Sequence, residues 1–236
     1  AVSAGGAGVM DFFHMDGQEV HEVAVGPVHA GVIEPGHFRF QCHGETVHHL
    51  EISLGYQHRG VQQALIGGPT RRSIHYAETL AGDTTIGHAT AYCVLVESLA
   101  AASAPARAWA IRAVAAELER LANHIGDLGA LAGDIGFLPT MSYCGRIRGD
   151  ALNLTALLCG NRFGRGLLTP GGVHWDLSAE TIAALLEGLD SLRRDTTSAV
   201  ELMFDAPSVL ARLEGTGVVD EGLARQIGLV GPASRA

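Results

Sequence analysis

Six large apolar residues recur at alternating steps of three and four in one stretch of the chain: Ile111, Val114, Leu118, Leu121, Ile125 and Leu128. An apolar residue every 3.5 positions forms a stripe along one side of an α-helix. Pro105 suits the first turn of this helix, because the amide groups there have no partner within the helix. The repeat therefore predicts a long helix that packs lengthwise against others.

Flanking segments predict the remaining members of a helical bundle. Long helices are expected over 73–102, 140–163 and 179–204, and short ones over 59–66 and 220–227. Gly82 and Gly87 would allow close approach in the first of these helices. Either Asp176 or Ser178 can cap the helix that begins at 179. A tight loop at 169–173 separates the last two long helices.

Strict alternation of apolar and polar residues predicts a β-hairpin over 37–54, with one face apolar. Turn residues at 43–45 separate its strands, and a shorter strand is expected over 21–25. The fold class is therefore α+β: a small antiparallel sheet followed by a bundle of about four long helices. Residues 1–22 read as a linker and 23–236 as a single domain.

Charge and composition exclude several classes of protein. The net charge of -9 argues against nucleic-acid binding, which requires a basic face. No run approaches the roughly 20 apolar residues of a membrane span. The four cysteines form no C-x-x-C pair, so free thiols in an intracellular protein are expected. Because neither end reads as an obvious terminus, we expect the chain to be a piece of a longer one.

The segment 26–40 concentrates groups that suit a functional site. It contains three glycines, two prolines, two histidines, one carboxylate and one guanidinium, and it leads directly into the predicted hairpin. Irregular loops with ionisable side chains often carry function. The alternative is a polar turn that only begins the hairpin.

Three ordered motifs carry a resemblance to a known family: G-P-x-H…E-P-G-H-F-R from Gly26, L-G-Y-x-H-R-G from Leu54, and G-x-x-x-x-x-H-x-x-x-Y-x-x-x-V-E from Gly82. Residues 117–124, 162–173 and 228–236 look like further blocks of the same family. The chain resembles, from about Val23 onward, the large subunit of group 4 [NiFe]-hydrogenases and the 49 kDa subunit of respiratory complex I, the NADH-quinone oxidoreductase. The resemblance implies their fold.

Two substitutions set this chain apart from active [NiFe]-hydrogenases. Those enzymes place a C-x-x-C pair where this chain has Ala81 and Thr84. Thiolates hold nickel and iron there, and a methyl group or a hydroxyl cannot replace them. The family's second C-x-x-C pair is not found in this sequence either. The resemblance therefore implies no NiFe centre and no metal ligand in this chain.

The resemblance also implies the site residues. In the complex I branch the emptied cavity receives a quinone head group, and Glu34 matches a proton-transfer glutamate of the hydrogenases. The predicted catalytic residues are Glu34, His37 and Asp83; the predicted cofactor-binding residues are His29, Arg39, Gly82, Thr84 and His88. Either His29 or His37 matches the quinone-facing histidine. The family's complex I branch also uses a tyrosine near the first lost cysteine position, and Ala81, Gly82 and Asp83 offer none there, which weakens the case for direct quinone reduction.

Alternatives remain for three of these residues. Asp83 and Thr84 either replace the lost metal ligands or bond to the backbone of their own helix. His88 either supports the old pocket or is a core histidine with its hydrogen bonds satisfied.

The expected function is that of a subunit in a membrane-associated complex, either NADH:quinone oxidoreductase-like or hydrogenase-4 and formate hydrogenlyase-like. The metal-free pocket would serve quinone binding or proton transfer. Expected partners are an iron–sulfur electron-transfer subunit and membrane-arm subunits. The expected location is peripheral, on the cytoplasmic side of a bacterial membrane. The alternative is a non-catalytic scaffold in such a complex, and an active [NiFe]-hydrogenase is disfavoured.

Overall fold

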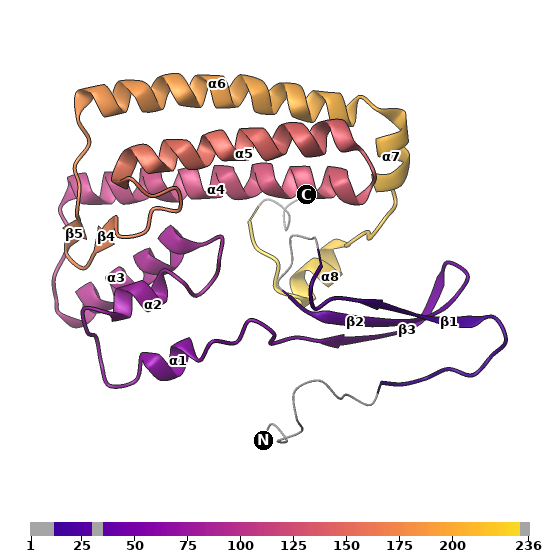
Figure 1. The fold of residues 1–236 in the computed structure, drawn as a ribbon. Coiled ribbons are helices and arrows are strands. Elements are labelled where there is room, and N and C mark those ends of the chain that lie inside the picture. Colours follow the sequence, from indigo (N-terminus) through magenta and orange to yellow (C-terminus); the bar gives the residue numbers. More distant parts are fainter. Residues whose placement is uncertain (1–11, 30–34, 232–236) are drawn as a thin grey trace. The chain divides into compact units, whose positions relative to one another are not determined.

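The computed structural model describes residues 12–29 and 35–231. Its contacts divide the chain into two compact units, residues 1–80 and residues 81–236. We call them the N-terminal unit and the bundle unit and describe each by itself (Figure 1). That residues 23–236 form a single domain stays a prediction.

A three-stranded antiparallel sheet dominates the N-terminal unit. Its strands, in spatial order, are β1 (Val20–Val25), β2 (His37–His43) and β3 (Thr46–Ser53). The register pairs Phe38 with Ile52 and Phe40 with Leu50, so alternation places these apolar side chains on one face. The predicted hairpin is confirmed, and Gly44, with φ of 58°, supplies the left-handed residue in its turn.

The prediction of one long helix over 73–102 is wrong, because two separate helices, α2 (Ser73–Ala77) and α3 (Thr85–Leu99), occupy this range. Two short helices, α1 (Val61–Ala64) and α2, end the N-terminal unit, and α3 begins the bundle unit. Thr84 has φ of -129° and ψ of 61°, which is not helical. Residues 81–84 therefore form a turn before α3. Asp83 and Thr84 are not helix residues, and the helical alternative for them is wrong.

Three long helices form the bundle proper: α4 (Ala106–Asp134), α5 (Leu138–Cys159) and α6 (Ala179–Phe204). Figure 1 shows them side by side, with α5 packed on both of the others. The hairpin of β4 (Leu168–Thr169) and β5 (Gly172–Val173) connects α5 to α6. Of the two predicted caps for α6 the structure uses Ser178, whose hydroxyl accepts the amide hydrogen of Thr181 at 3.1 Å.

Two short helices follow the bundle. The sequence predicts α8 (Glu221–Gln226) but not α7 (Pro207–Leu213), which is too short for an apolar stripe to repeat. Among the residues that the structure describes, no helix combines the length and the apolar character needed to cross a bilayer.

The buried stripe on α4 has the predicted period but a different composition. Its buried members are Ala108, Ile111, Arg112, Ala115, Leu118, Ala122, Ile125, Gly129 and Ala132. Val114 and Leu121, predicted in the stripe, remain 39% and 37% exposed. Small residues occupy the stripe because α5 approaches closely: a Cβ on Gly129 would lie 2.9 Å from the Cβ of Cys144.

Candidate functional site

The predicted site residues divide between the two units. Glu34 lies outside the described residues. The N-terminal unit holds His29, His37 and Arg39, and the bundle unit holds Gly82, Asp83, Thr84 and His88. Whether the two groups converge on one pocket stays a prediction.

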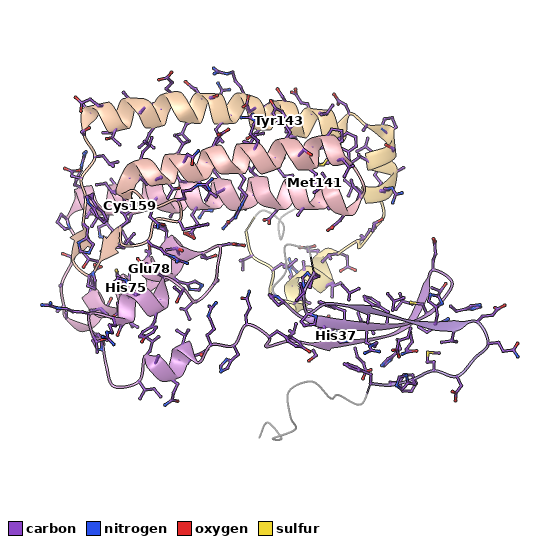
Figure 2. The ribbon with its side chains drawn as sticks, viewed as in Figure 1. His37, His75, Glu78, Met141, Tyr143 and Cys159 are labelled. Atoms are coloured by element: carbon purple, nitrogen blue, oxygen red, sulfur yellow. The ribbon has the colours of Figure 1, made fainter. Side chains whose placement is uncertain are left out.

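Both ring nitrogens of His37 have partners. Its Nδ1 lies 3.0 Å from the carbonyl oxygen of Gly26, and its Nε2 accepts a hydrogen bond from Nε of Arg39 at 3.4 Å. Because an arginine nitrogen can only donate, Nε2 is the accepting nitrogen and Nδ1 carries the proton. His37, labelled on the sheet in Figure 2, is therefore held through both ring nitrogens.

The Nε2 atom of His29 is buried and has no hydrogen-bond partner among residues 12–29 and 35–231. Its ring meets Phe38 edge to face, with 6.3 Å between the ring centroids. His29 and His37 thus differ in their bonding, but the match to the quinone-facing histidine stays open between them.

Arg39 belongs to a polar network on the sheet. Its guanidinium pairs with Glu22 and lies 4.6 Å from the ring centroid of Phe12. Glu22 also accepts a hydrogen bond from Gln41 at 2.7 Å. The Gln41 bond first, and then Arg39, hold the pKa of Glu22 below its ordinary value. In these contacts Arg39 stabilises the sheet, and its cofactor-binding role stays a prediction.

A small cavity lies in the bundle unit beside the turn at 81–84. Its polar lining comes from the turn, from the start of α3, from α4, from α5 and from the loop after α5: Asp83, Thr85, Glu119, Asn123, Arg148, Thr155 and Arg162. The space open to the centre of a water-sized sphere is about 10 Å³. Of the predicted site residues that the bundle unit contains, Asp83 lines this cavity. Gly82, Thr84 and His88 do not.

Glu119 is the functional candidate that the sequence does not reveal. It reaches from α4 to the N-terminus of α3, where its carboxylate accepts the amide hydrogens of Ile86 at 2.5 Å and Gly87 at 3.3 Å. Thr84, at the N-cap position, makes no side-chain capping bond, so Glu119 caps the helix in its place.

The electrostatics of Glu119 combine opposing effects. Burial raises the pKa of its carboxyl above the ordinary value, and the nearby charge of Asp83 acts in the same direction. The two amide hydrogen bonds lower it but do not cancel the effect of burial. Glu119 therefore holds a proton more readily than an ordinary glutamate, a property that suits proton transfer.

Asn123 holds the turn in place from the same helix. Its Nδ2 donates a hydrogen bond to the backbone oxygen of Asp83 at 2.9 Å. Asn123 and Glu119 lie four residues apart, so they share one face of α4. This face of α4 thus fixes both the turn and the first residues of α3.

Comparison with known proteins shows which family this chain resembles. Residues 134–236 match the model for the respiratory-chain NADH dehydrogenase 49 Kd subunit. This part of the chain therefore resembles that family. Relatives include membrane-bound hydrogenase subunit alpha of Pyrococcus furiosus, 29% identical over 91% of this chain and 50% of the relative. Formate hydrogenlyase subunit 5 of Escherichia coli is 30% identical over 91% of this chain and 38% of its own length.

A further relative comes from the complex I branch. An NADH-quinone oxidoreductase subunit of Dehalococcoides mccartyi is 33% identical over 90% of this chain and 58% of its own length. The chain thus spans about half the length of the curated relatives that it matches. The family predicted from the sequence motifs is confirmed, and so is the α+β fold.

The turn at 81–84 does not fit a nickel–iron centre. Ala81 and Thr84 offer a methyl group and a hydroxyl, and neither is a thiolate ligand. Within the described part of the chain, no group of three or more His, Cys, Asp or Glu residues is placed to hold a metal ion. Burial raises the pKa of the Cys144 thiol on α5, so this cysteine is a poor source of thiolate.

Proposed function

We propose that the chain is a subunit of a multisubunit, membrane-associated oxidoreductase of the complex I or group 4 hydrogenase kind. The support is the set of relatives, which are named as subunits of a membrane-bound hydrogenase, a formate hydrogenlyase and NADH-quinone oxidoreductases. In this proposal the chain is peripheral, on the cytoplasmic side of a bacterial membrane. Its partners are an iron–sulfur electron-transfer subunit and membrane-arm subunits.

Proton transfer is the chemistry we propose for the remnant of the metal pocket. One observation carries this proposal: the turn with Ala81 and Thr84, which lacks thiolates, stands beside the partly buried carboxyl of Glu119, whose pKa is raised. Asp83, from the same turn, lines the same cavity. Two carboxyl groups in different environments are a common arrangement for moving protons.

The size of the cavity bears on the quinone part of the proposal. Pockets that bind small organic molecules typically measure about 300–1,000 Å³. The cavity beside Asp83 is far smaller, at about 10 Å³, and cannot admit a quinone ring by itself. Quinone binding is therefore proposed on the family resemblance, whereas proton transfer also has support from the geometry of the bundle unit.

A non-catalytic scaffold is the second candidate, and the small size of the cavity favours it. In that case the turn and Glu119 only stabilise the start of α3. The chain would then position its neighbours in the complex without taking part in the reaction.

The replacement Asp83→Asn separates the two candidates. In the assembled complex, we expect the variant to retain its partner subunits and to lose turnover, because one protonatable group of the cavity is removed. Turnover with the native electron acceptor is measured per complex, after normalisation to iron–sulfur content. The matched control is Asp127→Asn, an aspartate on α4 that does not line the cavity, which should behave as the wild type. Full turnover in the Asp83 variant would support the scaffold.

A further inference from the structure

A buried hydroxyl at the start of α3 lacks a protein partner. Thr85 is 2% exposed, and its Oγ1 makes no hydrogen bond to any of the residues that the structure describes. Thr140, another buried threonine of the bundle unit, donates to the carbonyl of Ala199 at 3.1 Å, whereas the buried Oγ1 of Thr196 also has no partner among the described residues. Burying a hydroxyl without a partner is costly, so unpaired cases call for a specific cause.

Thr85 lines the small cavity beside Glu119. The volume of this cavity, about 10 Å³, is close to the roughly 10–15 Å³ that one water molecule needs. A buried water also needs two to four polar partners. Glu119, Asn123 and Asp83 line the same cavity as Thr85 and are the polar side chains nearest to hand for such a water, although most of the lining surface is apolar.

The charges around the cavity favour a neutral occupant. Its acidic side chains are Asp83 and Glu119, and its basic side chains are Arg148 and Arg162, so the formal charges cancel when all four are ionised. Arg162 is partly engaged elsewhere, because it donates to the backbone oxygen of Gly149 at 3.2 Å. Neither an anion nor a cation finds an excess of opposite charge, and a phosphate group exceeds the available volume.

Glu119 itself needs a partner that can both donate and accept. The amide groups of Ile86 and Gly87 can only donate, which suits the ionised carboxylate. A protonated carboxyl carries an O–H that needs an acceptor. A water molecule between Glu119 and Thr85 donates to the carboxylate or accepts from the protonated acid by rotating.

We propose that this cavity binds one structural water molecule that joins the Thr85 hydroxyl to the Glu119 carboxyl. The water completes the hydrogen bonds of the Thr85 hydroxyl. It also allows Glu119 to change protonation state while it stays bonded to the N-terminus of α3. This site depends only on the geometry of the bundle unit. It would stand even if the turnover of Asp83→Asn contradicted the proposed function.

Magnetic relaxation dispersion of water nuclei tests the proposal, because it counts long-lived internal waters in the full chain. We expect Thr85→Val to have one such water fewer than the wild type and to unfold at a lower urea concentration. Thr85→Ser keeps a hydroxyl and should keep the water. The matched control is Thr155→Val, since Thr155 lines the same cavity but its hydroxyl donates to the carbonyl of Ala151 at 3.4 Å.

The opposite results would overturn the proposal. If Thr85→Val retained every long-lived water and unfolded at the same or a higher urea concentration, the hydroxyl would be truly unpaired and its removal harmless. If Thr85→Val fails to fold, a measurement on the wild type alone tests the proposal. Magnetisation transfer from a long-lived water to the Ile86 and Gly87 amide protons supports the site, and the absence of such transfer excludes it.

Discussion

Replacement of Arg112 by alanine is expected to lower the free energy of unfolding by about 3–5 kcal/mol, the usual cost of breaking a buried ion pair from one side. Arg112 lies on α4 and is only 1% exposed. Its guanidinium donates to Glu97 of α3 at 2.6 and 3.2 Å. It also donates to the carbonyl oxygens of Thr169 and Gly172 at 2.9 Å.

The free energy of unfolding falls because the substitution removes the hydrogen-bond partner of several buried groups at once. Glu97 would remain buried as an uncompensated charge, and of its donors among the described residues the amide of Gly171, at 2.7 Å, would remain. The carbonyl oxygens of the β4–β5 hairpin would also lose their donor. This network joins α3, α4 and the hairpin, so the variant tests whether it holds these three elements together.

Urea unfolding at neutral pH measures the effect. The matched control is Arg107→Ala, because Arg107 bonds to Asp176 at 2.8 Å but both side chains are exposed. An exposed pair of this kind contributes about 0–1 kcal/mol. Similar losses in the two variants would contradict the structural role of Arg112.

The difference between the wild type and Arg112→Ala should also depend on pH. The hydrogen bonds from Arg112 hold the pKa of Glu97 below its ordinary value, although burial acts against them. The native state therefore releases this proton at a lower pH than the unfolded state does. The stabilisation is fully present above the ordinary glutamate pKa and is lost as the pH falls through the lowered one. The two unfolding curves should approach each other in acid.

Gly164→Ala is expected to destabilise the chain by about 2–5 kcal/mol, from backbone strain together with overpacking. Gly164 has φ of 72°, a conformation that disfavours a side chain. A Cβ at this position would lie 2.4 Å from Cδ1 of Ile86 and 3.6 Å from Cγ2 of Thr155. The loop after α5 is therefore packed directly against the start of α3, close to the cavity.

A substitution at Gly215 separates the cost of backbone strain from the cost of overpacking. It has the same φ of 72°, but no atom lies within 4 Å of the position that a Cβ would occupy. Gly215→Ala should therefore show only the cost of the left-handed backbone, about 1–2 kcal/mol. Calorimetry of both variants measures the difference. Equal losses would mean that Gly164 does not contact α3 as described.

The sequence predicts best those elements whose signals are local. The helix expected over 179–204 has those bounds in α6, because Ser178 caps it and its apolar pattern is continuous. The hairpin follows from strict alternation and a glycine turn. On α4 the period is predicted correctly, but alanine and glycine at the buried positions give a weak signal beside Val114 and Leu121.

The break between α2 and α3 depends on more than local residues. Asp83, Thr84 and Thr85 are residue types that often begin helices, so a local signal for a new start was present. The capping group, however, comes from Glu119, which lies 33 residues beyond Ile86 in the sequence. Such a contact can be recognised only once α3 and α4 are packed together.

The candidate site shows the same difference between local sequence signals and contacts made by distant residues. The motif around Asp83 predicts a helix where the structure has a turn, and Thr85 and Glu119 become candidates only through burial and hydrogen bonding. The unpaired state of the Thr85 hydroxyl depends on every neighbour that surrounds it. No spacing in the sequence carries that information.

The nickel content of the assembled complex is the most direct test of the central claim, that the turn at 81–84 holds no nickel–iron centre. The complex is purified in mild detergent, and its metals are measured by mass spectrometry against the amount of this chain. We expect iron, from the clusters of the partner subunit, without stoichiometric nickel, because Ala81 and Thr84 provide no thiolate. One nickel atom per chain would contradict the claim.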